Sequence, residues 1–277
     1  MGFRIATNVQ SLTAQRALSK MSVEEQKTTA QLSSGERITK SSDDSAGLAI
    51  SEKLKANIRS SAQANRNAND GISMIQVAEG GLNEQANILV RLRELAIQSA
   101  SDTVGETERG YTDMEYQQLK NELERISQTT VFNDVQLLNG EGEKLDFQIG
   151  ANNDDFKDRI TYDTGKINAG LDSLGLSDES VSTKEGAQGS LEKIDNAINT
   201  VSGQRAELGS LQNRLLTTSS NLETSIENMS AANSRIRDVD YAAATAKNTQ
   251  TNIMKQAGIS VLSQANQVPQ QALRLIG

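Results

Sequence analysis

The sequence lacks the side chains on which most enzyme active sites depend. Its 277 residues include no cysteine, no histidine and no tryptophan. Without histidine, the usual acid–base residue at neutral pH is missing. Without cysteine there is no disulfide, no thiol nucleophile and none of the commonest zinc ligands. An enzyme would have to use carboxylates or lysine, and no constellation of these stands out. The composition therefore predicts a protein that is not an enzyme and holds no metal or cofactor.

Proline and aromatic residues are also scarce, with one proline in the chain and aromatics at 3 %. This composition favours long helices with slim, alanine-lined contacts over a thick globular core. The net charge of −8 argues against nucleic acid as a main partner. No stretch approaches the roughly eighteen apolar residues of a transmembrane helix, so no membrane insertion is expected. The N-terminus also lacks the apolar run of a secretory signal peptide. These features predict either a cytosolic protein or export by a route that reads no cleavable signal.

One long helix is predicted between Leu191 and Val239, because every seventh residue from Ile194 is apolar. Positions seven apart fall on one side of a helix and form a narrow apolar seam. A long helix with one apolar stripe must lie along partner helices. The seam consists of Ile194, Val201, Leu208, Leu215, Leu222, Met229 and Ile236.

A second long helix is predicted from about Ala46 to Ser99, with the same period along Ala68, Ile75, Leu82, Leu89 and Ala96. The match in period and length makes the two helices antiparallel partners in a coiled coil. A third, shorter helix is expected from about Asp113 to Thr129.

The middle of the chain changes to a strand pattern. Val135–Leu138 and Leu145–Ile149 flank the turn-like segment Asn139–Gly142 and predict a β-hairpin. Arg159–Tyr162 is a candidate further strand. Leu174–Gly189 is rich in Gly, Ser, Asp and Glu, which favours an exposed connection.

The two ends of the chain predict weakly amphipathic helices, over about residues 5–31 and around residues 253–268. Their apolar stripes are too thin to order a helix alone, so we expect them to order in an assembly and to mediate polymerisation. The predicted contact residues are Ile5, Val9, Leu12, Leu18, Met21, Ile253, Ala257, Val261, Val268 and Leu273.

Six segments of the sequence resemble the signatures of one family, the bacterial flagellins. They are LSSGERI (32–38), DDSAGLAI (43–50), RNANDGIS (66–73), VRLRELA (90–96), FQIGAN (147–152) and QAGISVLSQANQVPQ (256–270). The resemblance covers both ends and the middle of the chain, in order.

This resemblance implies a mainly α fold with long antiparallel coiled-coil helices and a small β-hairpin region. Residues 1–40 with 238–277 would be a terminal helical inner-core domain that forms a coiled coil in the filament. Residues 41–175 with 190–237 would be the long-helix bundle with its hairpin. Residues 176–189 would replace the outer variable domains of longer flagellins, so the chain is similar to a short form.

The resemblance also implies a function and a set of partners. The subunit would be exported unfolded through the flagellar type III apparatus and would polymerise into a helical, extracellular filament for motility. Implied partners are other copies of the chain, a flagellin chaperone, and the filament cap and hook-junction proteins. A further implied partner is the host Toll-like receptor for flagellin, at Arg91, Leu95 and Glu115. These residues would be covered between subunits in the filament.

Two alternatives remain at this stage. A hook–filament junction protein shares the terminal helices of the same superfamily. The intact VRLREL stretch and the C-terminal match disfavour it. A coiled-coil adaptor or adhesin would account for the heptads but not for the six signatures.

Overall fold

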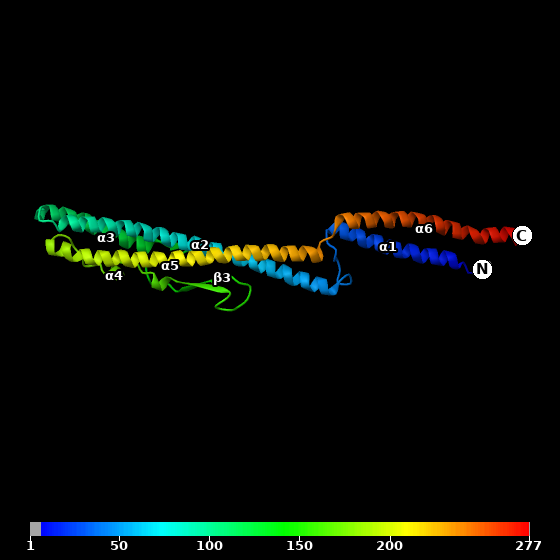
Figure 1. The fold of residues 1–277 in the computed structure, drawn as a ribbon, viewed down its shortest axis with the longest axis horizontal. Helices are drawn as coiled ribbons and strands as arrows, with labels where there is room; N and C mark the ends of the chain where they lie inside the picture. The colour runs from blue at the N-terminus through cyan, green and yellow to red at the C-terminus, as the bar shows by residue number, and fades with distance from the viewer. Residues whose placement is uncertain (1–6, 277) are drawn as a thin grey trace. The chain divides into compact units, whose positions relative to one another are not determined.

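The computed structural model describes residues 7–276, with side chains described as far as Gln267. Six α-helices and four short strands follow one another along these residues (Figure 1). The helices are α1 (Val9–Ser34), α2 (Ser45–Ser99), α3 (Glu106–Thr129), α4 (Leu171–Leu174), α5 (Lys184–Arg237) and α6 (Tyr241–Ile276). The strands are β1 (Val131–Phe132), β2 (Val135–Gln136), β3 (Lys144–Gln148) and β4 (Arg159–Asp163), and a 3-10 turn, η1, spans Thr164–Lys166. The predicted mainly helical fold is confirmed.

The chain divides into two compact units. Unit 1 contains the residues up to Ala56 and those from Asn228 onward, and unit 2 contains Asn57–Glu227. Each long helix therefore contributes to both units. The assignment of inner-core and bundle domains from the sequence, with boundaries near residues 40 and 238, stays a prediction.

Unit 2 is a bundle in which α2, α3 and α5 run beside one another (Figure 1). Nine predicted seam residues are fully buried in its core: Ala68, Ile75, Leu82, Leu89 and Ala96 on α2, and Ile194, Val201, Leu208 and Leu215 on α5. Leu222 is half-buried, as are Met229 and Ile236 in unit 1. Around Leu222 the contacts between α2 and α5 are polar, with the Ser219 hydroxyl donating to the Asn65 side chain at 2.6 Å. The burial of the seam thus decreases along α5 toward its C-terminal end.

The predicted hairpin between Val135–Leu138 and Leu145–Ile149 is wrong. β1 pairs with β2 around a two-residue turn, Asn133-Asp134, whose φ angles are 48° and 64°. Positive φ at both turn residues matches the right-handed twist of a tight hairpin, and Asn and Asp tolerate it. β3 instead pairs antiparallel with β4 across a longer loop, which confirms the candidate strand at residues 159–162.

The segment before α5 is not the exposed connection that its composition predicts. Its apolar residues Leu174, Leu176 and Val181 are buried. Side chains of α3 hold its backbone: the Lys120 ammonium donates to the carbonyls of Ser177 and Glu179, both at 2.8 Å, and the Asp113 carboxylate accepts the N–H of Val181. Asp113 belongs to the second turn of α3, which begins at Glu106, earlier than predicted.

The buried seam predicts a sharp contrast between two neighbouring positions on α5. Leu215→Asp places a carboxylate in a site with 0 % exposure, and this should lower the free energy of unfolding by several kcal/mol, on the order of 3–5. Gln212→Ala changes a half-buried polar residue and should cost less than about 1 kcal/mol. Thermal and urea unfolding of the monomer measures both. Equal losses would contradict the assigned register of α5.

Candidate self-assembly surface

In unit 1, α1 and α6 lie side by side (Figure 1), and polar contacts supply much of what joins them. The Asn8 side chain donates to the carbonyl of Ala265 at 2.8 Å, and the Ser11 hydroxyl donates to Asn266 at 2.9 Å. Lys255 forms an ion pair with Glu25 at 2.6 Å. Such contacts fix the register of two helices, but they leave several of the larger apolar side chains outside the contact between α1 and α6.

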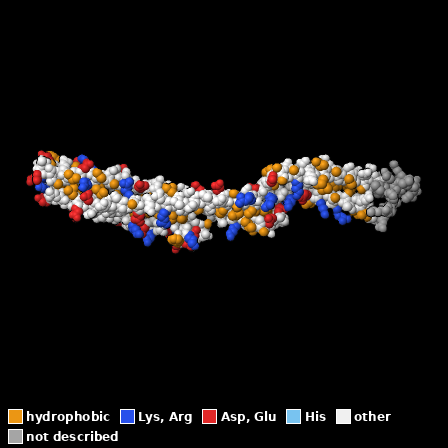
Figure 2. All heavy atoms as spheres, viewed as in Figure 1, with side chains coloured by type: hydrophobic (Ala, Val, Ile, Leu, Met, Phe, Trp, Pro, Cys, Tyr) orange, Lys and Arg blue, Asp and Glu red, His pale blue; other side chains and the backbone are white. Residues whose placement is uncertain are grey.

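Many of those apolar side chains point away from the α1–α6 pair. Ile253 is 61 % exposed and Val261 56 %, whereas the buried apolar residues described on α6 are the small Ala244 and Ala265. Figure 2 shows hydrophobic side chains, in orange, at the surface along α6. Large exposed apolar patches mark surfaces that another molecule covers. The α1–α6 pair therefore resembles one part of a larger helical assembly.

The predicted polymerisation residues fall into three groups. Leu18 and Met21 are half-buried, and Leu18 packs on Gly258, where an added Cβ would lie 3.0 Å from it. Ile5 lies outside the described residues, and the side chains of Val268 and Leu273 are outside them too. The exposed members of the set are Val9, Leu12, Ile253, Ala257 and Val261.

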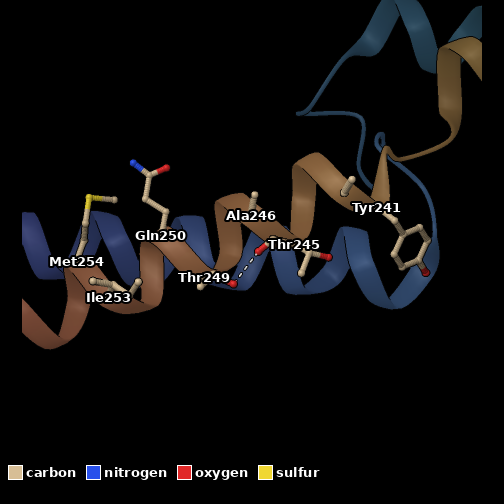
Figure 3. A pocket seen from close by; sticks show the side chains of 8 residues that line it. Tyr241, Thr245, Ala246, Thr249, Gln250, Ile253 and Met254 are labelled. Atoms are coloured by element: carbon tan, nitrogen blue, oxygen red, sulfur yellow. Dashed lines mark hydrogen bonds between the residues drawn. The ribbon is translucent and has the colours of Figure 1, made fainter.

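A shallow depression runs along one face of α6 (Figure 3). The Thr249 hydroxyl donates to the carbonyl of Thr245 at 2.9 Å, so its hydrogen-bonding capacity is used within the helix. At one end Tyr241 donates its hydroxyl to the carbonyl of Leu32 at 2.7 Å, and this ties α6 to α1. Small residues in a row let the backbone of a second helix approach closely. The lining residues are Tyr241, Ala242, Thr245, Ala246, Thr249, Gln250, Ile253 and Met254.

Within unit 1, two arginines hold together the two segments that connect the terminal helices to the long helices. The Arg37 guanidinium donates to the carbonyl of Ile236, at 2.6 and 3.2 Å, and so caps the C-terminal end of α5. In the opposite direction, Arg237 forms ion pairs with Glu36, at 2.9 Å, and with Glu52. Backbone bonds from Arg37 N to Arg237 O and from Val239 N to Gly35 O complete the link.

The turn before α2 is organised around Asp43. The ammonium of Lys27, 3.0 Å away, and the N–H groups of Lys40 and Thr39 lower the pKa of the Asp43 carboxyl to about 2. The carboxylate therefore stays ionised throughout the neutral range, and it connects α1 to the residues that precede α2.

The residues predicted to bind a receptor lie together in unit 2, but not all three are accessible. Arg91 on α2 forms ion pairs with Glu115 on α3, at 2.7 Å, and with Glu94, at 2.9 Å. These carboxylates raise the pKa of Arg91. The Leu95 side chain is 2 % exposed and belongs to the core cluster, so it is not part of the accessible surface.

Comparison with known proteins identifies the family. The model of the bacterial flagellin N-terminal helical region matches residues 5–143, and that of the C-terminal helical region matches residues 191–276. The chain belongs to the bacterial flagellins. It is a subunit of the extracellular flagellar filament, used for motility, and not an enzyme.

Flagellins from two bacteria match nearly the whole chain. The flagellin of Halalkalibacterium halodurans is 45 % identical over 251 residues, which cover 91 % of each chain. The flagellin of Bacillus subtilis strain 168 is 40 % identical and covers 99 % of both. The crystal structure of Bacillus cereus flagellin is similar at 30 % identity with a TM-score of 0.50, over 61 % of this chain and 94 % of that one.

The predicted alternatives, a hook–filament junction protein and a coiled-coil adaptor, are set aside by these matches. A putative flagellar hook-associated protein from Vibrio parahaemolyticus has a TM-score of 0.57, but at 14 % identity this likeness shows the fold alone. Within residues 7–276, every helix falls short of the apolar length that crossing a membrane requires.

The paired arginines predict that Arg237 stabilises the connecting segments of this flagellin. Arg237→Ala removes two ion pairs from a side chain with 15 % exposure and leaves two carboxylates near each other, so it should cost about 1–2 kcal/mol. It should also speed hydrogen exchange at the N–H groups of Arg37 and Val239. Arg235→Ala, at an exposed position two residues away, is the control and should change stability by less than about 0.5 kcal/mol. Unchanged exchange in Arg237→Ala would contradict the proposed role of the side chain.

Proposed function

We propose that the exposed apolar faces of α1 and α6 are the surfaces through which copies of this flagellin polymerise. The observation that carries the proposal is the outward direction of Val9, Leu12, Ile253 and Val261 on a helix pair whose inner contacts are largely polar. Burying such side chains against further helices is favourable by about 25 cal/mol per Å² of apolar surface removed from water. Neighbouring subunits would supply those helices.

The same features support export of the chain in an unfolded state through the flagellar type III apparatus. A chain without cysteine forms no disulfide, before or after it reaches an oxidising exterior. Helices with thin apolar stripes unfold at low cost and regain order when they are packed. In the cell, a flagellin chaperone would cover the exposed face of α6. Outside it, the cap and hook-junction proteins would contact the two ends of the filament.

The proposed surface predicts that assembly and folding can be separated. Deletion of residues 253–277 should leave unit 2 folded and the protein soluble, because the core of unit 2 contains no residue of α6. The truncated protein should not form filaments in electron micrographs. A truncated protein that still polymerised would overturn the proposal.

A point variant gives a finer test. Val261→Asp adds a charge to the exposed apolar face and should raise the critical concentration for polymerisation at least tenfold, while the melting temperature of unit 2 stays unchanged. Ser263→Asp adds the same charge two residues along α6, about 200° around the helix, and serves as the matched control.

A second proposal is that this flagellin is a ligand of the host Toll-like receptor for flagellin. It is supported by the joint placement of Arg91 and Glu115 on adjacent helices, each about half exposed. A planar guanidinium held by carboxylates is a rigid group of the kind that dominates binding energy at interfaces. Leu95 would contribute by packing beneath Arg91, because its side chain is buried.

Receptor recognition predicts that Arg91→Ala monomer activates receptor-reporter cells at least tenfold less strongly than the wild type. Arg125→Ala is the control, because Arg125 is also exposed and also pairs with a carboxylate three residues away, Glu122. Equal activity of the Arg91→Ala and wild-type proteins, or an inactive wild type, would contradict the proposal.

A further inference from the structure

The methionine side chains of this chain differ widely in their exposure to solvent. Met74 is 8 % exposed and belongs to the core of unit 2, whereas Met254 on α6 is 39 % exposed and Met114 on α3 is 59 % exposed. Met21 and Met229 are half-buried. In a chain without cysteine, the methionine thioethers are the only sulfur groups that an oxidant can modify. Among the described residues, Met114 and Met254 are therefore the methionines most open to a dissolved oxidant.

Met254 lies on the exposed apolar face of α6. It lines the shallow depression of that face, and Figure 3 shows its side chain projecting from α6 beside Ile253 and Gln250. Ala257 and Val261, three and seven residues further along the chain, are also exposed. Residues at these spacings share one side of a helix. The thioether of Met254 therefore belongs to the same face as the apolar side chains that are proposed to mediate polymerisation.

The surroundings of Met254 suit an apolar thioether and not a polar sulfoxide. None of the described residues that line the depression is charged. Two of its hydroxyl groups are already used as donors, because Thr249 donates to the carbonyl of Thr245 at 2.9 Å and Tyr241 donates to that of Leu32 at 2.7 Å. A methionine side chain is flexible and fills irregular gaps in an apolar contact. Its sulfoxide is polar, and burying a polar group that lacks a hydrogen-bond partner is unfavourable.

We propose that Met254 is an oxidation site through which hydroperoxides regulate the polymerisation of this flagellin. The inference rests on the proposed self-assembly and names a modification that controls it. The sulfur of Met254 attacks one oxygen of hydrogen peroxide, so that an S–O bond forms while the O–O bond breaks. The hydroxide that leaves takes the proton of the transferred oxygen and becomes water. The sulfur is oxidised by two electrons to the sulfoxide, and the peroxide is reduced.

The position of Met254 makes the effect of peroxide depend on the state of assembly. In the monomer the thioether is accessible, and its oxidation places a polar oxygen on the face that the proposed polymerisation covers. In a filament the same face is covered, so the thioether is protected. Oxidation therefore prevents new subunits from adding and leaves finished filaments intact. A methionine sulfoxide reductase, which converts the sulfoxide back to the thioether, restores the ability of the monomer to polymerise.

The first test compares two variants treated with hydrogen peroxide as monomers, Met114→Leu and the double variant Met114→Leu with Met254→Leu. Met114→Leu removes the other strongly exposed methionine, and leucine keeps the apolar character and approximate volume of the side chain. Once peptide mass spectrometry shows the sulfoxide at position 254, the critical concentration of Met114→Leu for seeded polymerisation should rise at least tenfold. The peroxide-treated double variant should polymerise like its untreated form.

Two outcomes of this comparison would overturn the inference. One is normal polymerisation of Met114→Leu with the sulfoxide present at position 254. The other is an equal loss of polymerisation in the double variant. The melting temperature of unit 2, measured by circular dichroism after the same treatment, should stay unchanged in both variants, because the buried Met74 is protected.

A second test measures the protection of Met254 by assembly. Peptide mass spectrometry should show that Met254 is oxidised at least tenfold more slowly in wild-type filaments than in wild-type monomers at the same peroxide concentration. Equal rates would overturn the inference. Failure of the proposed function is distinguishable, because it would show as normal polymerisation of Val261→Asp. Failure of the present inference alone would leave Val261→Asp defective while protein oxidised at Met254 polymerised normally.

Discussion

The narrow apolar stripe on each long helix is the constraint from which the rest of the structure follows. A helix with one stripe of apolar side chains is unstable alone and gains its stability from helices that cover the stripe. In unit 2 the chain supplies those helices itself, so that Leu82, Leu89, Leu208 and Leu215 are fully buried. In unit 1 two helices pair but leave several of their larger apolar residues, such as Val9, Ile253 and Val261, exposed. Under the proposed function, a polymer of chains would cover what one chain leaves exposed, and assembly would then complete the burial that the fold of one chain begins.

Where little apolar surface is buried, polar contacts fix the relative positions of the helices. The α1–α6 pair is kept in register by Asn8, Ser11 and the Lys255–Glu25 ion pair, and the connecting segments by Arg37 and Arg237. Surface ion pairs contribute little free energy individually, typically less than about 1 kcal/mol, but they depend strongly on geometry. A subunit held in this way can unfold at low cost, as the proposed export would require, and still return to one register when it is packed.

The heptad spacing was sufficient to predict the long helices. An apolar residue at every seventh position, sustained over many turns, is compatible with only one structure, a long helix with an apolar stripe. The strand pairing was not predictable in the same way. Val135–Gln136 pairs with Val131–Phe132, because two residues with positive φ make a tighter turn than the Asn139–Gly142 loop. Gly81 marks the place where α2 and the residues after β2 approach closely, since an added Cβ there would lie 2.7 Å from Leu138, but this contact does not indicate which strands pair. The buried connection before α5 was missed because Lys120 and Asp113 hold its backbone from α3, and long-range polar contacts leave no local pattern.

The residues that the sequence predicts at the receptor site belong to one motif but differ in burial. Arg91 and Leu95 are four residues apart on one helix, yet Arg91 points to solvent and Leu95 to the core. Their spacing of four residues alone predicted a shared face of α2. The packing of α3 determines which of the two side chains is covered. Glu115, the partner of Arg91, adjoins Met114 on α3, whose side chain is 59 % exposed. A second copy packed against this part of α3 would therefore cover much of the surface proposed for the receptor. Under the receptor proposal, the monomer would therefore be recognised, and a filament in which these side chains are covered would not.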